Sequence, residues 1–244
     1  MTGTILNIIT IIIGSTLGMI FGSRFPDRIR KTVIAGLGLF TAAIGIQMFL
    51  KTENAIIVLG SILIGGILGE WWKIEEKLNR FGGYLEQQLT KNSTHQDESI
   101  QGENSQRERF MRGFLTSSLL FCVGPMTILG SIQDGLTGDY RLLATKAVLD
   151  GFASLAFASS LGIGVLFSII TVFIVQGGLS MLAAQAAAII TEPMMNEMTA
   201  AGGLLLMGLA ISSLLEIKTI RVGNFLPALI IAPLIVALLS FLGY

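Results

Sequence analysis

The stretch GFLTSSLLFCVGPMTILGSIQDG, residues 113–135, decides the fold class. Its first 19 residues form an apolar run without a charge. A bilayer core of about 30 Å needs roughly 20 such residues per helix. Comparable runs cover residues 4–22, 32–50, 55–72, 198–215 and 223–243. The chain is therefore predicted to be an all-α bundle of helices that crosses a membrane several times.

The composition supports a membrane protein and excludes other classes. Of the 244 residues, 52% are hydrophobic and 13% are charged, and the mean hydropathy is +0.74. Sixteen basic and 16 acidic residues give a net charge of zero. Because there is no basic stripe, no nucleic-acid partner is expected, and the lipid bilayer is the expected surrounding. The single cysteine, Cys122, excludes an intramolecular disulfide.

The number of spans depends on the stretch 142–191, whose strong polar residues are Lys146, Asp150 and Gln176. Two long helices, 142–162 and 164–190, give eight spans, whereas a break at Gln176-Gly177-Gly178 gives nine. Basic residues near span ends stay on the cytoplasmic side. Eight spans place 13 basic residues inside against two outside, and nine spans place 11 against four. We expect about eight spans, within a range of seven to nine, with both termini outside.

A polar segment divides the chain, because 14 of its 32 charges lie between Lys73 and Arg112. We expect a first membrane unit of three spans (1–72), a cytoplasmic insert (73–112) and a second membrane unit of about five spans (113–244). Residues 73–91 are predicted to form an interfacial amphipathic helix with Leu78, Phe81, Tyr84, Leu85 and Leu89 on its apolar side. Residues 92–106 are typical of a flexible linker. The only histidine, His95, lies in this linker and is assigned no metal.

A weak internal repeat relates residues 26–64 to residues 193–231, with nine identities in 39 ungapped positions. The pair Lys51-Thr52 matches Lys218-Thr219 at the end of the same helix in each copy. In the eight-span topology these pairs lie on opposite sides, so spans 1–3 and spans 6–8 would be inverted copies. Inverted repeats are typical of secondary transporters. Nine spans would make the copies parallel and weaken this inference.

The fourth span contains a helix breaker in its middle. Pro125 removes a backbone donor, and Gly124 and Gly130 loosen the helix around it. We expect a kink or break that bares carbonyl groups, which only protein or a wet cavity can satisfy inside a membrane. Such a break can bind an ion or a polar solute. The alternative is an ordinary proline kink packed against neighbouring helices.

The fifth span carries two charges, Lys146 and Asp150, four residues apart on one helix face. An isolated charge at the bilayer centre costs about 2.5–3.5 kcal/mol, which favours a functional role. Alternatively, Lys146 snorkels to the outer surface with Asp150 as its partner. Because spans 4 and 5 are joined by a short loop, we predict one solute- or ion-binding site between them, formed by Gly124, Pro125, Gln133, Asp134, Lys146 and Asp150.

Other polar residues within spans are secondary candidates, namely Gln47, Gln176 and Asn224. Amides in membrane helices more often join helices than bind solutes. The series Gly14-xxx-Gly18-xxx-Gly22 and Gly65-xxx-Gly69 indicates close helix packing and offers faces for a homo-oligomer. Catalytic, nucleotide-binding and metal-ligand motifs are absent from the sequence, so we expect no enzyme, no cofactor and no metal site.

Three stretches carry a resemblance to a known family. They are LFCVGPMTILGSIQDGLTGD (120–139), KAVLDGFASLAFASSLGIGV (146–165) and GSTLGMIFGSRFPDRIRKTVIAGLGL (14–39). With them the chain resembles the YqgA and YdfK group of bacterial inner-membrane proteins, which is filed under a domain of unknown function. The resemblance covers nearly the whole chain outside the polar insert. It implies a multi-pass protein of the bacterial plasma membrane and supplies no substrate.

The broken helix, the two buried charges and the repeat together favour a secondary transporter of a small polar or charged solute, coupled to an ion or a proton. Two alternatives remain open. An ion channel would use the same cavity as a continuous path. A membrane assembly or partner-binding protein that transports nothing would keep the charged pair for structure alone.

Overall fold

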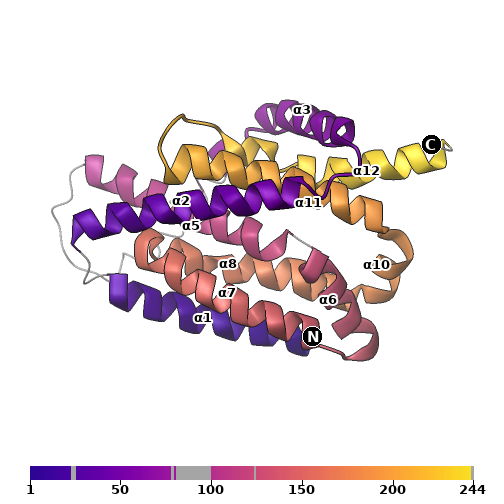
Figure 1. The fold of residues 1–244 in the computed structure, drawn as a ribbon, viewed down its shortest axis with the longest axis horizontal. Coiled ribbons are helices and arrows are strands. Elements are labelled where there is room, and N and C mark those ends of the chain that lie inside the picture. The colour runs from indigo at the N-terminus through magenta and orange to yellow at the C-terminus, as the bar shows by residue number, and fades with distance from the viewer. Residues whose placement is uncertain (23–25, 78–79, 81–99, 124, 243–244) are drawn as a thin grey trace.

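The computed structural model describes residues 1–22, 26–77, 80, 100–123 and 125–242. Every regular element in this part of the chain is helical (Figure 1). The all-α expectation is confirmed. The helices, in chain order, are α1 (Thr2–Gly22), α2 (Asp27–Phe49), α3 (Ala55–Trp71), α5 (Ile100–Cys122), α6 (Pro125–Thr137), α7 (Arg141–Leu161), α8 (Gly164–Val172), α9 (Gly178–Met181), α10 (Ala183–Ile189), α11 (Glu192–Leu209) and α12 (Ala228–Phe241), with η1 (Phe173–Gly177), η2 (Ala210–Leu214) and η3 (Val222–Phe225) beside them.

Six helical segments of the described chain are long and apolar enough to cross a bilayer. The bent pair 108–122 and 126–137 makes a seventh if it is counted as one span, and α3 is a shorter apolar helix of 17 residues. The expected count of about eight therefore lies at the margin of what the helices support. The beginning of α1 and the end of α12 lie toward the same end of the bundle (Figure 1).

Glycines of α1 bring this helix into contact with the backbone of α7. A Cβ atom added at Gly14 would lie 2.2 Å from the carbonyl oxygen of Gly151, and one at Gly18 would lie 2.3 Å from that of Leu155. Gly22 is equally close to Ser159, at 2.0 Å. The expected close packing is thus confirmed. These glycines pack within one chain, which corrects the expectation that they offer a free face for a homo-oligomer.

The two repeat copies run antiparallel to each other. Gly38 contacts Leu215 and Gly45 contacts Gly203, so α2 and the helix formed by α11 and η2 run in opposite directions. In the same way Gly65 contacts Ala228 and Gly69 contacts Asn224, which makes α3 antiparallel to the C-terminal helix. An inverted repeat requires this arrangement, and the common origin of the copies stays a prediction.

The stretch 142–191 contains one hairpin of two long helices. Gly162, with φ of +75°, forms the turn after α7, a conformation that favours glycine. The second helix continues through Gln176 and Gly177 as the π-helical turn η1, so the break on which nine spans depended does not occur there. It ends at Met181 instead of residue 190, and α10 follows as a separate short helix.

The hairpin turn between α7 and α8 is held by a residue from another helix. Arg109 of α5 donates a hydrogen bond from Nε to the carbonyl oxygen of Ser160, at 3.0 Å. The sequence of the turn alone, 161–164, has no polar residue for this purpose. The anchoring contact therefore comes from the polar segment that precedes the fourth span.

The polar insert is more helical than its composition indicates. Because α5 begins at Ile100, the predicted flexible linker 92–106 is wrong for its last seven residues. The prediction failed because it took polar composition as a sign of a linker. The polar residues at the start of α5 instead continue a membrane helix beyond its apolar part. Residues 78–79 and 81–99 lie outside the described residues. They include His95 and most of the predicted amphipathic helix.

We predict that Gly18→Ala destabilises the protein by about 1–3 kcal/mol, because the added Cβ would overlap the backbone of Leu155. Gly36→Ala is the matched control, since an added Cβ at Gly36 meets no atom within 4 Å. The thermal unfolding midpoint of both purified variants in detergent tests this. Equal midpoints would contradict the close contact between α1 and α7.

Candidate functional site

Lys146 and Asp150 form an ion pair inside the protein. Both lie on α7, four residues apart, and each is only 6% exposed. The Lys146 ammonium also lies 5.8 Å from the ring centroid of Phe121. Lys146 therefore points into the bundle, and the alternative in which it snorkels to the outer surface is wrong.

Helix α1 provides a third partner that the sequence analysis missed. Asn7 is fully buried, and its side-chain amide donates a hydrogen bond to Oδ2 of Asp150, at 2.9 Å. A signal for Asn7 exists in the sequence, because it follows the same helix face as Gly3, Gly14 and Gly18. A polar residue on the glycine face of a membrane helix is directed at a neighbouring helix.

The fourth span is bent, as predicted. Its two parts, Glu108–Cys122 and Met126–Thr137, are bent by 60° relative to each other. Pro125 has no N–H to donate to the carbonyl of Phe121 four residues earlier. The hydroxyl of Thr127 donates to that carbonyl instead, at 3.0 Å. The carbonyl of Phe121 therefore has a partner within the bent span. Gly124 lies outside the described residues, and the expectation that the break opens other carbonyl groups to a solute stays a prediction.

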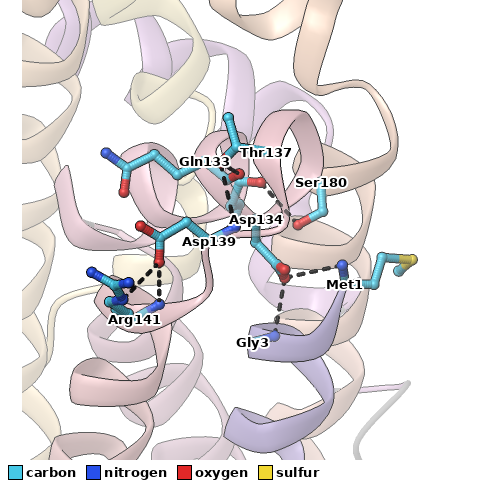
Figure 2. Close-up of polar contacts among 9 residues, drawn as sticks. Met1, Gly3, Gln133, Asp134, Thr137, Asp139, Arg141 and Ser180 are labelled. Carbon is cyan, nitrogen blue, oxygen red and sulfur yellow. Dashed lines mark hydrogen bonds and ion pairs between the residues drawn. The ribbon is translucent and has the colours of Figure 1, made fainter.

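Asp134 lies against the beginning of α1, whereas Gln133 does not. The side chain of Asp134 is buried, and its Oδ2 accepts a hydrogen bond from the backbone N–H of Gly3 at 3.0 Å and lies 3.1 Å from the amino group of Met1 (Figure 2). Gln133, the preceding residue, is exposed. Its predicted place in the site is wrong because successive residues of a helix point about 100° apart.

The structure thus brings three predicted residues, Asp134, Lys146 and Asp150, to one side of α1. Asp134 contacts Gly3 and Asp150 contacts Asn7, and these two positions are one helical turn apart on α1. The predicted site between the fourth and fifth spans therefore includes the first span as well. Asp139 is exposed in the loop between α6 and α7, where it pairs with Arg141.

The secondary candidates differ in their surroundings. Gln47 is exposed on α2. Gln176 is fully buried in η1, and neither atom of its side-chain amide has a hydrogen-bond partner among the described residues. Asn224 joins helices, since it donates to Glu70 at 2.5 Å and accepts from the backbone N–H of Glu75 at 2.8 Å. Asn224 is thus interhelical, as amides in membrane helices usually are.

Glutamate carboxylates bind the connecting segment of each repeat copy, between α2 and α3 in the first copy and between η2 and α12 in the second. After α2, the buried carboxylate of Glu197 accepts hydrogen bonds from the hydroxyl of Thr52 and from the backbone N–H groups of Glu53 and Asn54, at 2.7–2.9 Å. At the corresponding connection before α12, Glu70 pairs with Arg221 at 2.8 Å, and Glu75 accepts from the backbone N–H of Gly223 at 2.7 Å. The sequence analysis missed these three glutamates.

Burial raises the pKa of Glu75, which lies after α3 and outside the spans, above its ordinary value of 4.5. The hydrogen bond from Gly223 and the charge of Arg221 act in the opposite direction and are weaker. The folded protein therefore holds a proton on Glu75 at a pH at which the unfolded chain has lost it. Part of the stability at acidic pH depends on this proton.

The fold and this site define a class of protein, a multi-pass helical membrane protein with charged residues inside its bundle. Comparison with known proteins places the chain more closely. Residues 2–237 match the family model described as "Protein of unknown function (DUF554)", and the chain belongs to this family. The resemblance seen in the sequence is thereby confirmed.

Two curated relatives extend over nearly the whole chain. The "Uncharacterized membrane protein YdfK" of Bacillus subtilis (strain 168) is 30% identical over 247 residues, covering 100% of this chain and 99% of the relative. The "Uncharacterized protein YqgA" of Escherichia coli (strain K12) is 32% identical over 230 residues, covering 94% of each. No solved structure matches the chain. The protein is a bacterial multi-pass membrane protein.

We predict that Lys146→Ala is more destabilising than Lys146→Ala combined with Asp150→Ala. The single change leaves the buried Asp150 carboxylate without its cation, which costs about 3–5 kcal/mol. The double change removes both charges. Unfolding midpoints of the two variants in detergent measure the difference, and a double variant that is no more stable than the single one would contradict the pairing.

We predict that Glu75→Gln increases stability at neutral pH relative to the unchanged protein. The raised pKa of Glu75 stabilises the folded state fully below pH 4.5, and this stabilisation is lost as the pH rises through the pKa of the folded state. Glutamine stays neutral and still accepts from Gly223. Unfolding midpoints from pH 4 to 8 should converge at the acidic end. Glu76→Gln, at an exposed neighbouring residue, controls for the loss of a charge.

Proposed function

We propose that the protein is a secondary transporter of a small polar or charged solute, coupled to an ion or a proton, and that Asp150 carries the coupling ion. The observation that carries this proposal is the ion pair of Lys146 and Asp150, buried beside a broken helix and completed by Asn7. The solute and the coupling ion are the small-molecule partners in this proposal.

Stability alone gives little reason for such a pair. Removing two charges from water costs several kcal/mol per ion, and well-packed apolar residues often stabilise a protein as much or more. Inside a membrane, ionisable residues that face the bundle interior are typical of ion and proton pathways. The burial of Lys146 and Asp150 among α1, α5 and α7 supports this role over a purely structural one.

The pair offers a simple coupling mechanism. In the empty state Lys146 neutralises Asp150. When a proton or cation binds the Asp150 carboxylate, the ammonium group of Lys146 is released and can pair with an anionic group of the solute. Loaded and empty states then differ in charge pairing without an isolated buried charge. The antiparallel repeat copies supply two related halves that can open the site to either side in turn.

The cavities of the described residues favour a carrier over a channel. One cavity, of about 780 Å³, lies between α5, η1, α11 and α12 and is lined almost entirely by apolar side chains. Ser118 and Thr171, which lie on its wall, are hydrogen-bonded to each other. A channel needs a continuous polar path, whereas a carrier keeps its site closed between its two open states.

We predict that Asp150→Asn abolishes solute uptake and leaves folded protein in the membrane. The amide has nearly the same shape and cannot take up a coupling ion as a carboxylate does. Proteoliposomes screened against metabolite mixtures under an inward proton or sodium gradient measure uptake and counter-flow exchange. Size-exclusion chromatography in detergent reports folding.

The control is Glu76→Gln, which removes an exposed carboxylate from the segment after α3. It should transport normally. Normal uptake by Asp150→Asn would refute the proposed role of this carboxylate. Single-channel currents in planar bilayers, without saturable uptake, would favour the channel, and the absence of both activities would favour a structural protein.

A further inference from the structure

Six buried side-chain atoms lack hydrogen-bond partners where α1, α6 and η1 meet. Each belongs to a residue that is at most 3% exposed. Within the described part of the chain no partner is found for Thr4 Oγ1, Asn7 Oδ1, Ser131 Oγ, Asp134 Oδ1, Gln176 Nε2 and Gln176 Oε1. We refer to this group as the polar cluster.

Direct contacts connect the three elements that carry the polar cluster. Gly3, next to Thr4, donates its backbone N–H to Asp134. Ser180, one turn after Gln176, donates its hydroxyl to the carbonyl of Ser131 at 3.0 Å (Figure 2). An added Cβ at Gly177 would lie 3.3 Å from Met1, so η1 also reaches the start of α1. The unpaired groups therefore belong to one region of the bundle.

Leaving these groups unpaired is too costly for a folded protein. Each buried polar group without a hydrogen bond costs about 1–3 kcal/mol. In addition, Gln176 lies in a π-helical turn, an irregularity that occurs frequently at functional sites. Polar molecules must supply the missing hydrogen bonds.

The chemistry of the polar cluster favours water over a metal cation. The Gln176 amide and the hydroxyls of Thr4 and Ser131 include donors, which a cation cannot use. Asp134 already lies beside the amino group of Met1, and Asp150 is paired with Lys146. Among the described residues, this region therefore has no unmatched negative charge to attract a cation. Water donates and accepts, and it commonly fills such places in proteins.

We propose that the polar cluster is a water-filled path along which protons move from the end of α6 to Asp150. This inference rests on the proposed function and makes the proton its coupling ion. Asp134 lies one turn before Thr137, which lines an open hollow of about 500 Å³ around the loop between α6 and α7. From Asp134, the path follows α1 through Thr4 to Asn7, which contacts Asp150.

Protons and charge are conserved at each step of the transfer. A hydronium ion at the hollow gives a proton to the first water, each water passes one proton on, and the last water protonates the carboxylate of Asp150. Asp150 becomes a neutral acid and Lys146 keeps its charge. Lys146 on the same helix and the Cys122 thiol on α5 are the titratable groups that interact with Asp150 in the described residues.

The test measures whether small ions in water reach the polar cluster. Ser131→Cys and Thr4→Cys are made separately in a Cys122→Ser background and treated with silver nitrate in intact cells, in chloride-free nitrate buffer. Unreacted thiols are counted with a maleimide after denaturation. Ser168→Cys is the matched control, because Ser168 is equally buried and its hydroxyl is bonded to the carbonyl of Val165.

We expect silver to react with the cysteines at positions 4 and 131 at least tenfold faster than with the one at position 168. Equal rates would refute the water-filled path. Protection of position 131 by sodium nitrate, but not by choline nitrate, would show a metal-cation site and also overturn the proposal. Because this test requires no transport, a dry cluster would leave the proposed function intact, and failure of the Asp150→Asn prediction would leave the accessibility result intact.

Discussion

The close contact between α1 and α7 is the constraint on which the polar interior depends. Three glycines let α1 lie directly on the backbone of α7, at Gly151, Leu155 and Ser159. At that distance the short side chain of Asn7 reaches Asp150. A larger residue at the glycine positions would separate the helices and leave the charged pair without its third partner. Helix packing here determines electrostatics, because it brings Asn7 of α1 within hydrogen-bond distance of Asp150 on α7.

The parts of the site that could be predicted from sequence are those that depend on local geometry. Lys146 and Asp150 pair because residues four apart share a helix face, and the fourth span bends because proline lacks a donor. The glycine series predicted close packing for the same local reason. What each of these features contacts was not predictable, since spacing within a helix does not identify its neighbour.

The missed residues have their origin in tertiary contacts, whereas two wrong predictions have local causes. Asn7 and Glu197 were missed because their partners lie more than 140 positions away in the chain. Gln133 was placed in the site with Asp134, although adjacent helical residues face different directions and only Asp134 turns toward α1. The linker prediction failed for residues 100–106 because a polar composition does not prevent a helix from continuing beyond the membrane.

Two kinds of carboxylate serve different purposes in this bundle. Glu197 accepts three hydrogen bonds at the connection between α2 and α3, and Glu70 and Glu75 hold the segment before α12 through Arg221 and Gly223. These contacts fix the antiparallel repeat copies to each other near their ends. Asp134 and Asp150, by contrast, lie against α1. An oxygen of Asp134 and side-chain atoms of Asn7 and Gln176 have no hydrogen-bond partner among the described residues. Satisfied carboxylates stabilise a scaffold, whereas the incompletely satisfied polar groups are the ones on which the proposed proton path depends.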